Sequence, residues 1–190
     1  MLGVSNWETP RVNESQAEAG RDPGLPRPVL SSPYFSLLEM SSITTHSGGV
    51  QVKHDEMLDP AFQSGIKIMT YSPLGGFSII RNGWENARRG ALELKNSGDR
   101  DWGHAYDAIF HEANEKRFNR ALGFTDKFNA ANGTHYTVDQ VLNAYVLAHE
   151  RVDFLAIGPR DVQQLRQTVE ALRLSKKLTQ ADLDCLDKNE

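Results

Sequence analysis

Short apolar runs alternate along the chain with segments whose apolar residues recur at helical spacing. The runs typical of buried strands cover residues 2–5, 28–31, 65–71 and 153–157. Because helical segments separate these runs, the pattern predicts parallel strands joined by helical crossovers. The sequence therefore predicts an α/β fold.

Helix signals stand between and after these runs. Helices are expected after Thr9 with Pro10 in the first turn, weakly over 55–64, across Tyr106, Ile109, Phe110 and Ala113, after the capping box Thr137–Gln140, after the cap Asp161, and after Thr179. Leu165, Val169 and Leu172 are expected to face inward, as are Leu183 and Leu186. The stretch 80–102 has no clear period, so no helix is predicted there.

Composition narrows the class of protein. Hydrophobic residues are 39% and charged residues 24% of the chain, and the mean hydropathy is -0.51, which is typical of a water-soluble globular protein. No apolar run reaches the roughly 18 residues of a membrane span. The net charge of -4 argues against nucleic acid, since phosphate binding favours a basic surface.

The single cysteine and the first residues bear on the compartment. Cys185 forbids an internal disulfide and is expected to be a small buried residue of the last helix. Residues 1–6 have no basic leader and no long apolar core, unlike a signal peptide. We therefore expect a cytoplasmic protein.

Generic motifs give little chemistry. The glycine patterns of dinucleotide and phosphate loops are absent, and His111-Glu112-Ala113-Asn114-Glu115 lacks the second histidine of a zinc-protease helix. His46, His54, Asp55 and Glu56 have the chemistry of metal ligands, but a solvated loop is the favoured interpretation. No metal site is predicted.

Polar residues and glycines at three strand ends are more specific. They are Ser5-Asn6, the turn from Tyr71-Ser72-Pro73 to Leu74-Gly75-Gly76, and Gly158-Pro159-Arg160 before the Asp161 helix. In parallel α/β folds, ligands bind at the carboxyl ends of strands. Asn6 suits a carboxamide and Tyr71 a flat heterocycle, while an arginine at a helix N-terminus suits a phosphate. Ordinary turn chemistry is the alternative for each one alone.

These segments closely resemble the aldo-keto reductases. The motifs are Gly3-Val4-Ser5-Asn6-Trp7, Tyr71-Ser72-Pro73-Leu74-Gly75-Gly76, and Ile157-Gly158-Pro159-Arg160 with Gln164-Leu165, in the family's order. The resemblance spans essentially all 190 residues and implies strands five to eight of a (β/α)8 TIM barrel. It implies one oxidoreductase domain over residues 1–190 that lacks the N-terminal half of the barrel.

The resemblance also implies an NADP(H) site. Ser5 and Asn6 match the residues that hold the nicotinamide carboxamide, Tyr71 the stacking ring, and Ser72, Leu74 and Gly75 the pyrophosphate turn; Gly158, Arg160 and Gln164 match the region of the adenosine 2′-phosphate. Three positions depart from the family. Ser32 replaces a glutamine that contacts the carboxamide, and Gln167 and Thr168 replace the residues that meet the adenine.

No segment matches the family's catalytic tetrad, which lies on strands two to four. The first hypothesis is an NADP-dependent oxidoreductase that reduces aldehydes or ketones, and its proton donor is not identified. The alternatives are a truncated, non-catalytic protein that binds NADP or a partner chain, and a fragment without a stable fold. Unpaired sheet edges would favour self-association as a homodimer. We expect the insertion 80–136 to shape the substrate mouth or to cover the cofactor. Trp84, Trp102 and Phe110 are candidates for lining that mouth, but ordinary helix packing is the favoured interpretation.

Overall fold

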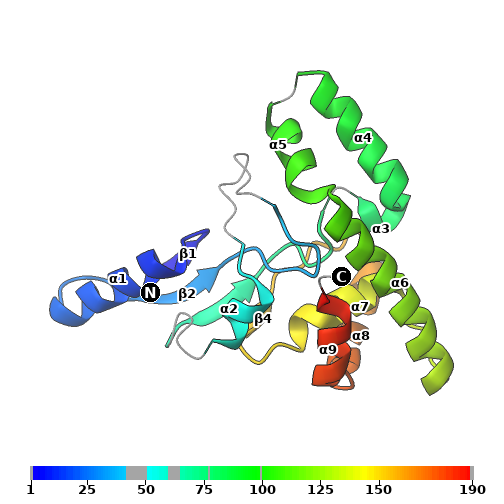
Figure 1. Cartoon of the computed structure of the whole chain (residues 1–190). Helices are drawn as coiled ribbons and strands as arrows, with labels where there is room; N and C mark the ends of the chain where they lie inside the picture. Colours follow the sequence, from blue (N-terminus) through cyan, green and yellow to red (C-terminus); the bar gives the residue numbers. More distant parts are fainter. Residues whose placement is uncertain (1, 42–50, 60–64, 77, 99, 189–190) are drawn as a thin grey trace.

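A computed structural model of the 190-residue chain describes residues 2–41, 51–59, 65–76, 78–98 and 100–188 (Figure 1). Its elements in chain order are β1 (Leu2–Ser5), α1 (Thr9–Arg21), β2 (Pro28–Ser32), α2 (His54–Leu58), β3 (Lys67–Thr70), α3 (Ile79–Asn82), α4 (Trp84–Asn96), α5 (Arg100–Ile109), α6 (Glu112–Asn132), α7 (Val138–Leu147), β4 (Phe154–Leu155), α8 (Val162–Ser175) and α9 (Gln180–Asp187).

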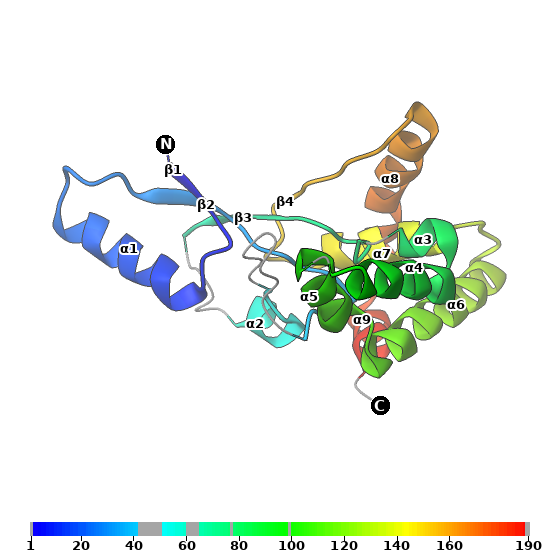
Figure 2. The ribbon, with the colours of Figure 1, turned by 90° about the horizontal axis from the view of Figure 1, so that it is seen from above.

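The four strands form one parallel sheet in the order β1-β2-β3-β4. Figure 2 shows the strands crossing the molecule from α1 towards α8. The α/β prediction is confirmed, and the sheet is consistent with part of a (β/α)8 barrel. Because all four strands run in the same direction, their carboxyl ends share one edge of the sheet.

The fourth strand is shorter than predicted. It pairs with β3 through Phe154 and Leu155 only. At its entry, the Asp153 carboxylate accepts a hydrogen bond of 2.9 Å from the Ile68 backbone N–H, and the Lys67 ammonium lies 2.6 Å from the same carboxylate. At its exit, the Ala156 N–H donates to the Thr70 carbonyl at 2.8 Å, and the side chain of Ile157 is exposed. One backbone hydrogen bond continues the pairing at each end, because the Asp153 N–H donates to the Ile68 carbonyl at 3.0 Å and the Ala156 N–H to the Thr70 carbonyl, and the Asp153 side chain adds a third contact at the entry.

The stretch without a clear period is helical, contrary to the prediction. It forms α3, α4 and the start of α5. The buried face of α4 consists of Trp84, Ala87 and Ala91. Alanines at this spacing carry little hydrophobicity, so the helical period is weak in the sequence. The Trp84 ring packs against Phe110 at 5.2 Å between centroids, which confirms helix packing for both; the Trp102 side chain lies outside the described part.

The segment predicted as one helix from Tyr106 to Ala113 is two helices. α5 ends at Ile109, and α6 begins at Glu112 after His111 in extended conformation. The Asn114 side chain donates a hydrogen bond of 2.9 Å to the Ile109 carbonyl, so a residue of α6 satisfies the end of α5. The long insertion is therefore a bent helical unit rather than a single rod.

Two buried clusters hold the described residues together. One includes Ile68 of β3, Tyr145 of α7, Leu174 of α8 and Leu186 of α9, and it lies between the sheet and the C-terminal helices. The other joins the insertion helices to Tyr34 and Leu38, which follow β2. The predicted burial of Leu183 and Leu186 is confirmed.

Two predictions of burial are wrong. Leu165, Val169 and Leu172 of α8 are 41%, 50% and 47% exposed, because α8 rests on α7 through its opposite face, Ala171 and Leu174. Figure 2 shows the N-terminal end of α8 standing away from the sheet. Cys185 is exposed rather than buried, because Leu183 and Leu186 occupy the inner face of the short helix α9.

Candidate functional site

The ends of β1 and β2 are joined by hydrogen bonds at the carboxyl edge of the sheet. The Asn6 N–H donates to the Ser32 carbonyl at 3.1 Å, and the Ser5 hydroxyl donates to the same carbonyl at 3.2 Å. One strand further, the Tyr71 N–H donates to the Pro33 carbonyl at 3.3 Å. The contribution of Ser32 is thus its backbone carbonyl, which aligns the two neighbouring strand ends.

Tyr71 connects the first and third strands. Its phenol donates a hydrogen bond of 2.7 Å to the Asn6 side-chain carbonyl, across β2. Asn6 has a φ of 56°, which turns its side chain back over the sheet edge, and asparagine tolerates this left-handed conformation better than most residues. The Tyr34 ring meets the Tyr71 ring edge-on, with centroids 5.9 Å apart. The half-buried Tyr71 ring is therefore held at its hydroxyl and supported by Tyr34.

The turn after β3, residues 71–76, has a special backbone. Ser72, Gly75 and Gly76 have φ values of 55°, 74° and 78°, and the Gly75 N–H donates to the Ser72 carbonyl at 3.1 Å. A Cβ on Gly75 would lie 2.6 Å from Leu38 Cδ1, whereas one on Gly76 would meet nothing within 4 Å. Gly75 thus serves the shape of the turn, and the Ser72 side chain is exposed to solvent. Leu74 packs at the edge of the core.

The chain leaves β4 and leads through Gly158 and Arg160 into α8. Asp161 caps α8 by accepting a hydrogen bond of 2.8 Å from the Gln164 N–H, as predicted. The Gln164 side chain accepts from the Arg160 N–H at 2.9 Å and so shapes the loop before the helix. The Arg160 side chain is exposed, and among the described residues no carboxylate forms an ion pair with it.

Gln167 and Thr168, the two residues that the resemblance places near the adenine, lie further along α8. The Thr168 hydroxyl donates to the Gln164 carbonyl at 2.9 Å within the helix. The Gln167 carbonyl accepts from the Gln140 side chain of α7 at 3.1 Å, which ties the two helices together. The structure therefore brings Ser5, Asn6, Ser32 and Tyr71 into direct contact, while Gln167 and Thr168 make contacts of a helix.

Sequence reasoning missed the segment that lies beneath this site. Tyr34, Ser36 and Leu38 follow β2, and all three are buried. The Tyr34 hydroxyl donates to the Leu38 carbonyl at 2.6 Å, and burial raises the pKa of this phenol well above its usual range. The Ser36 hydroxyl donates to the Pro73 carbonyl at 2.9 Å. An apolar run immediately after a strand was the available signal, but it does not reveal contacts over 37 residues of sequence.

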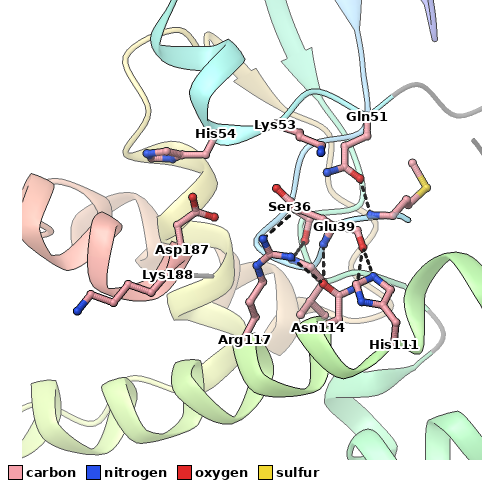
Figure 3. A network of polar contacts seen from close by, with 12 residues as sticks. Ser36, Glu39, Gln51, Lys53, His54, His111, Asn114, Arg117, Asp187 and Lys188 are labelled. Atoms are coloured by element: carbon pink, nitrogen blue, oxygen red, sulfur yellow. Dashed lines mark hydrogen bonds and ion pairs between the residues drawn. The ribbon is translucent and has the colours of Figure 1, made fainter. Parts of the chain in front are cut away.

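A second polar cluster lies between this segment and the C-terminal helices (Figure 3). The Arg117 guanidinium lies 2.9 Å from the Glu39 carboxylate, and Asn114 contacts the Glu39 backbone. Figure 3 also shows His54, at the start of α2, near Asp187 of α9. The His54 Nδ1 atom lies 2.7 Å from Nε2 of His149, a histidine that the sequence analysis did not single out.

The residues considered as metal ligands in the sequence, His54, Asp55 and Glu56, do not form a metal site among the described residues. No group of three or more His, Cys, Asp or Glu side chains among them is arranged to hold a metal ion. His46 lies outside the described residues. The Glu56 side chain accepts from the Lys53 N–H at the start of α2, and the Asp55 side chain accepts from the Glu56 N–H. His111 contacts the Glu39 carbonyl at 3.0 Å. These side chains have local structural roles.

The structure is an α/β protein in which polar side chains gather at the carboxyl ends of a parallel sheet, the edge where ligands generally bind in such folds. A comparison with models of protein families matches residues 1–189 to the Aldo/keto reductase family. The chain therefore belongs to the aldo/keto reductase family, which is a family of oxidoreductases. No curated protein matched the chain. No helix in the described ranges is both long and apolar enough to cross a membrane.

Proposed function

We propose that this chain binds NADP(H) along the carboxyl edge of the sheet and serves hydride transfer between NADPH and an aldehyde or ketone. The observation that carries the proposal is the Tyr71–Asn6 hydrogen bond of 2.7 Å, which joins an aromatic ring and a polar amide side chain at one place. Ser5 and Asn6 would hold the nicotinamide carboxamide, and the Tyr71 ring would stack on the nicotinamide. The exposed single cysteine suits a reducing compartment, the cytoplasm.

The donors near the turn and near α8 fit the two phosphate regions of the cofactor. The exposed Ser72 hydroxyl and the open backbone at Gly76 suit a pyrophosphate. Gly75 is different, because its N–H already donates within the turn. At α8, the helix N-terminus and the exposed Arg160 guanidinium suit the 2′-phosphate. The Gln164 side chain supports the Arg160 backbone at this end.

The residues at the edge have definable tasks in the reaction. Bound NADPH supplies a hydride from its nicotinamide ring. Asn6 and Tyr71 orient that ring, because the hydrogen bond between them fixes both side chains relative to the sheet. The alkoxide that forms from the carbonyl needs a proton or a positive partner. The phenols of Tyr34 and Tyr71 donate to Leu38 and Asn6, respectively, so neither is proposed as the proton donor.

The absence of an assigned proton donor in the described part of the site favours a second candidate function. In this alternative, the chain binds NADP(H) without reducing a carbonyl compound. The two functions share the cofactor site and differ in turnover. Carbonyl-dependent consumption of NADPH, followed by absorbance, separates them.

Fluorescence titration with NADPH and with NADH tests the proposed site. We expect wild-type protein to bind NADPH more tightly than NADH, because the Arg160 guanidinium forms charge-assisted hydrogen bonds with the 2′-phosphate. Arg160→Gln should weaken NADPH binding roughly tenfold to a hundredfold and leave NADH binding unchanged. Arg166→Gln, an exposed arginine further along α8, is the matched control and should keep the preference. Equal affinity of the wild-type protein for both cofactors, or none for either, would refute the proposal.

A further inference from the structure

The segment 33–39 supports the turn 71–76 from beneath. The Ser36 hydroxyl donates to the Pro73 carbonyl at 2.9 Å and accepts from the Leu38 N–H at 3.1 Å. The Leu38 side chain fills the space that a Cβ on Gly75 would need. Together with the Tyr71 N–H bond to Pro33 and the Tyr34–Tyr71 ring contact, these contacts support both the start and the middle of the turn from a single segment after β2.

Helix α6 holds the far end of this segment. Asn114 is fully buried; its side-chain oxygen accepts from the Glu39 N–H at 2.9 Å, and its amide donates to the Glu39 carbonyl at 2.6 Å. Arg117 adds an ion pair of 2.9 Å with the Glu39 carboxylate (Figure 3). Both backbone groups and the charge of Glu39 are thus engaged by two residues of α6.

Burial of this ion pair indicates a role in geometry rather than in net stability. The side chains of Arg117 and Glu39 are 4% and 19% exposed. Removing two charges from water costs free energy that their attraction offsets only in part, so such pairs contribute little net stability compared with apolar residues. They do disfavour other arrangements, because any movement of Glu39 would leave a buried charge without its partner.

We propose that Asn114 and Arg117 of α6, acting through Glu39 and Ser36, are positioning residues for the turn 71–76. This inference rests on the proposed function, since the turn is taken as part of the NADP(H) site. In this arrangement, α6 of the insertion fixes the shape of the turn through the segment 33–39 rather than through a direct contact of Asn114 or Arg117 with the turn.

We call the contacts of Asn114 and Arg117 with Glu39, together with that of Ser36 with Pro73, the clamp. Its loss has a defined consequence for the affinity for NADPH. Without it, the turn occupies its binding conformation for a smaller fraction of the time, and the apparent Kd rises by the reciprocal of that fraction. The effect concerns the part of the cofactor that meets the turn. Contacts of the 2′-phosphate with Arg160 lie at the end of β4 and should be unaffected.

Two variants remove the clamp at different points without leaving a buried charge alone. Ser36→Ala removes the contact with Pro73, and the double variant Glu39→Leu with Arg117→Met replaces the ion pair by apolar side chains. Each should raise the Kd for NADPH roughly fivefold to fiftyfold, while the Kd for 2′-AMP changes less than about twofold. Arg117→Lys keeps a positive charge beside Glu39 and should retain most of the wild-type affinity for NADPH.

Ser31→Ala is the matched control, because Ser31 is a buried serine of the adjoining strand β2 whose hydroxyl has no hydrogen-bond partner among the described residues. It should leave both dissociation constants unchanged. The triple variant with Ser36→Ala, Glu39→Leu and Arg117→Met should bind NADPH with a Kd no higher than that of the weaker-binding of the two variants it combines. The reason is that both of those variants break the same set of contacts.

The outcomes separate this inference from the proposed function. If wild-type protein does not bind NADPH, the proposed function fails. If wild-type protein binds NADPH and both clamp variants bind it equally well, the inference is overturned while the function stands. Additive losses, or equal losses for NADPH and 2′-AMP, would indicate general destabilisation and would also overturn it. Thermal unfolding of every variant, followed by circular dichroism, verifies that each is folded.

Discussion

Gly75 is a position where the backbone and a neighbour both require glycine. Its φ is 74°, and a Cβ there would lie 2.6 Å from Leu38 Cδ1 and 3.1 Å from Leu38 Cβ. Gly76 has nearly the same φ, 78°, but open space around it. Both Gly→Ala variants carry the left-handed penalty of roughly 1–2 kcal/mol. Gly75→Ala should lose about 1–3 kcal/mol more, because Leu38 has to move.

Urea denaturation of the two alanine variants measures this difference directly. We also expect Gly75→Ala, and not Gly76→Ala, to weaken NADPH binding, since only the former disturbs the packing under the turn. Equal loss of unfolding free energy in both variants would show that the Leu38 contact does not constrain the turn.

At this same scale, the sequence located the strand ends but not what supports them. Asn6 and Tyr71 could be predicted as neighbours because parallel strands end at one edge. The contact of Ser36 with Pro73 joins residues 37 positions apart, and nothing in the local pattern of a serine between apolar residues reveals it. Gln164 was predicted from its spacing after Asp161, yet its side chain reaches the Arg160 N–H, a choice that depends on the loop geometry.

At the scale of elements, strong local signals were sufficient and weak ones were not. The capping residues Thr137, Asp161 and Thr179 each stand before a helix as predicted. The helix α4 was missed because its buried face is rich in alanine, and the break before α6 was missed because Asn114 satisfies the end of α5 through tertiary structure. Helix boundaries inside the insertion therefore depend on contacts that only folding creates.

The contact between the end of α7 and the start of α2 makes a prediction about pH. His149 donates through Nδ1 to the Tyr145 carbonyl at 2.8 Å, so Nε2 accepts from His54. Burial lowers the pKa of His149 from 6.5 to about 4. Between these values the unfolded chain binds a proton that the folded chain does not, so stability falls as the pH falls from about 6.5 to about 4. The loss is on the order of 3 kcal/mol at 1.36 kcal/mol per pKa unit.

Thermal unfolding across this pH range tests the assignment to His149. His149→Gln keeps a donor and an acceptor but does not titrate, so its stability should depend less steeply on pH. His135→Gln, which removes an exposed histidine, should behave like the wild-type protein. Burial raises the pKa of the Asp187 carboxyl above 3.8, which opposes the histidine effect at the acid end of the range. Identical pH profiles for His149→Gln and wild type would contradict the prediction.

At the scale of the whole molecule, the surface carries an apolar face that the sequence pattern assigned to the interior. It consists of Val162, Leu165, Val169 and Leu172 along α8, and Phe154 and Ile157 at β4 are exposed as well. The pattern identified the apolar stripe of α8 correctly, but it could not show that α8 packs on α7 through its other side. Within the described sheet, β1 and β4 are the two edge strands, so each has one unpaired side.

A second copy of the chain is the occupant we expect for this face. Since all strands are parallel, the free side of β4 in one copy matches the free side of β1 in another, and a two-fold arrangement pairs both edges at once. One chain has a mass of 21.2 kDa, and light scattering should then give twice that mass. Leu165→Lys with Val169→Lys should weaken association at least about tenfold, whereas Leu94→Lys, an equally exposed leucine of α4, should not. A wild-type protein that stays monomeric at high concentration would show that a second copy does not cover this face.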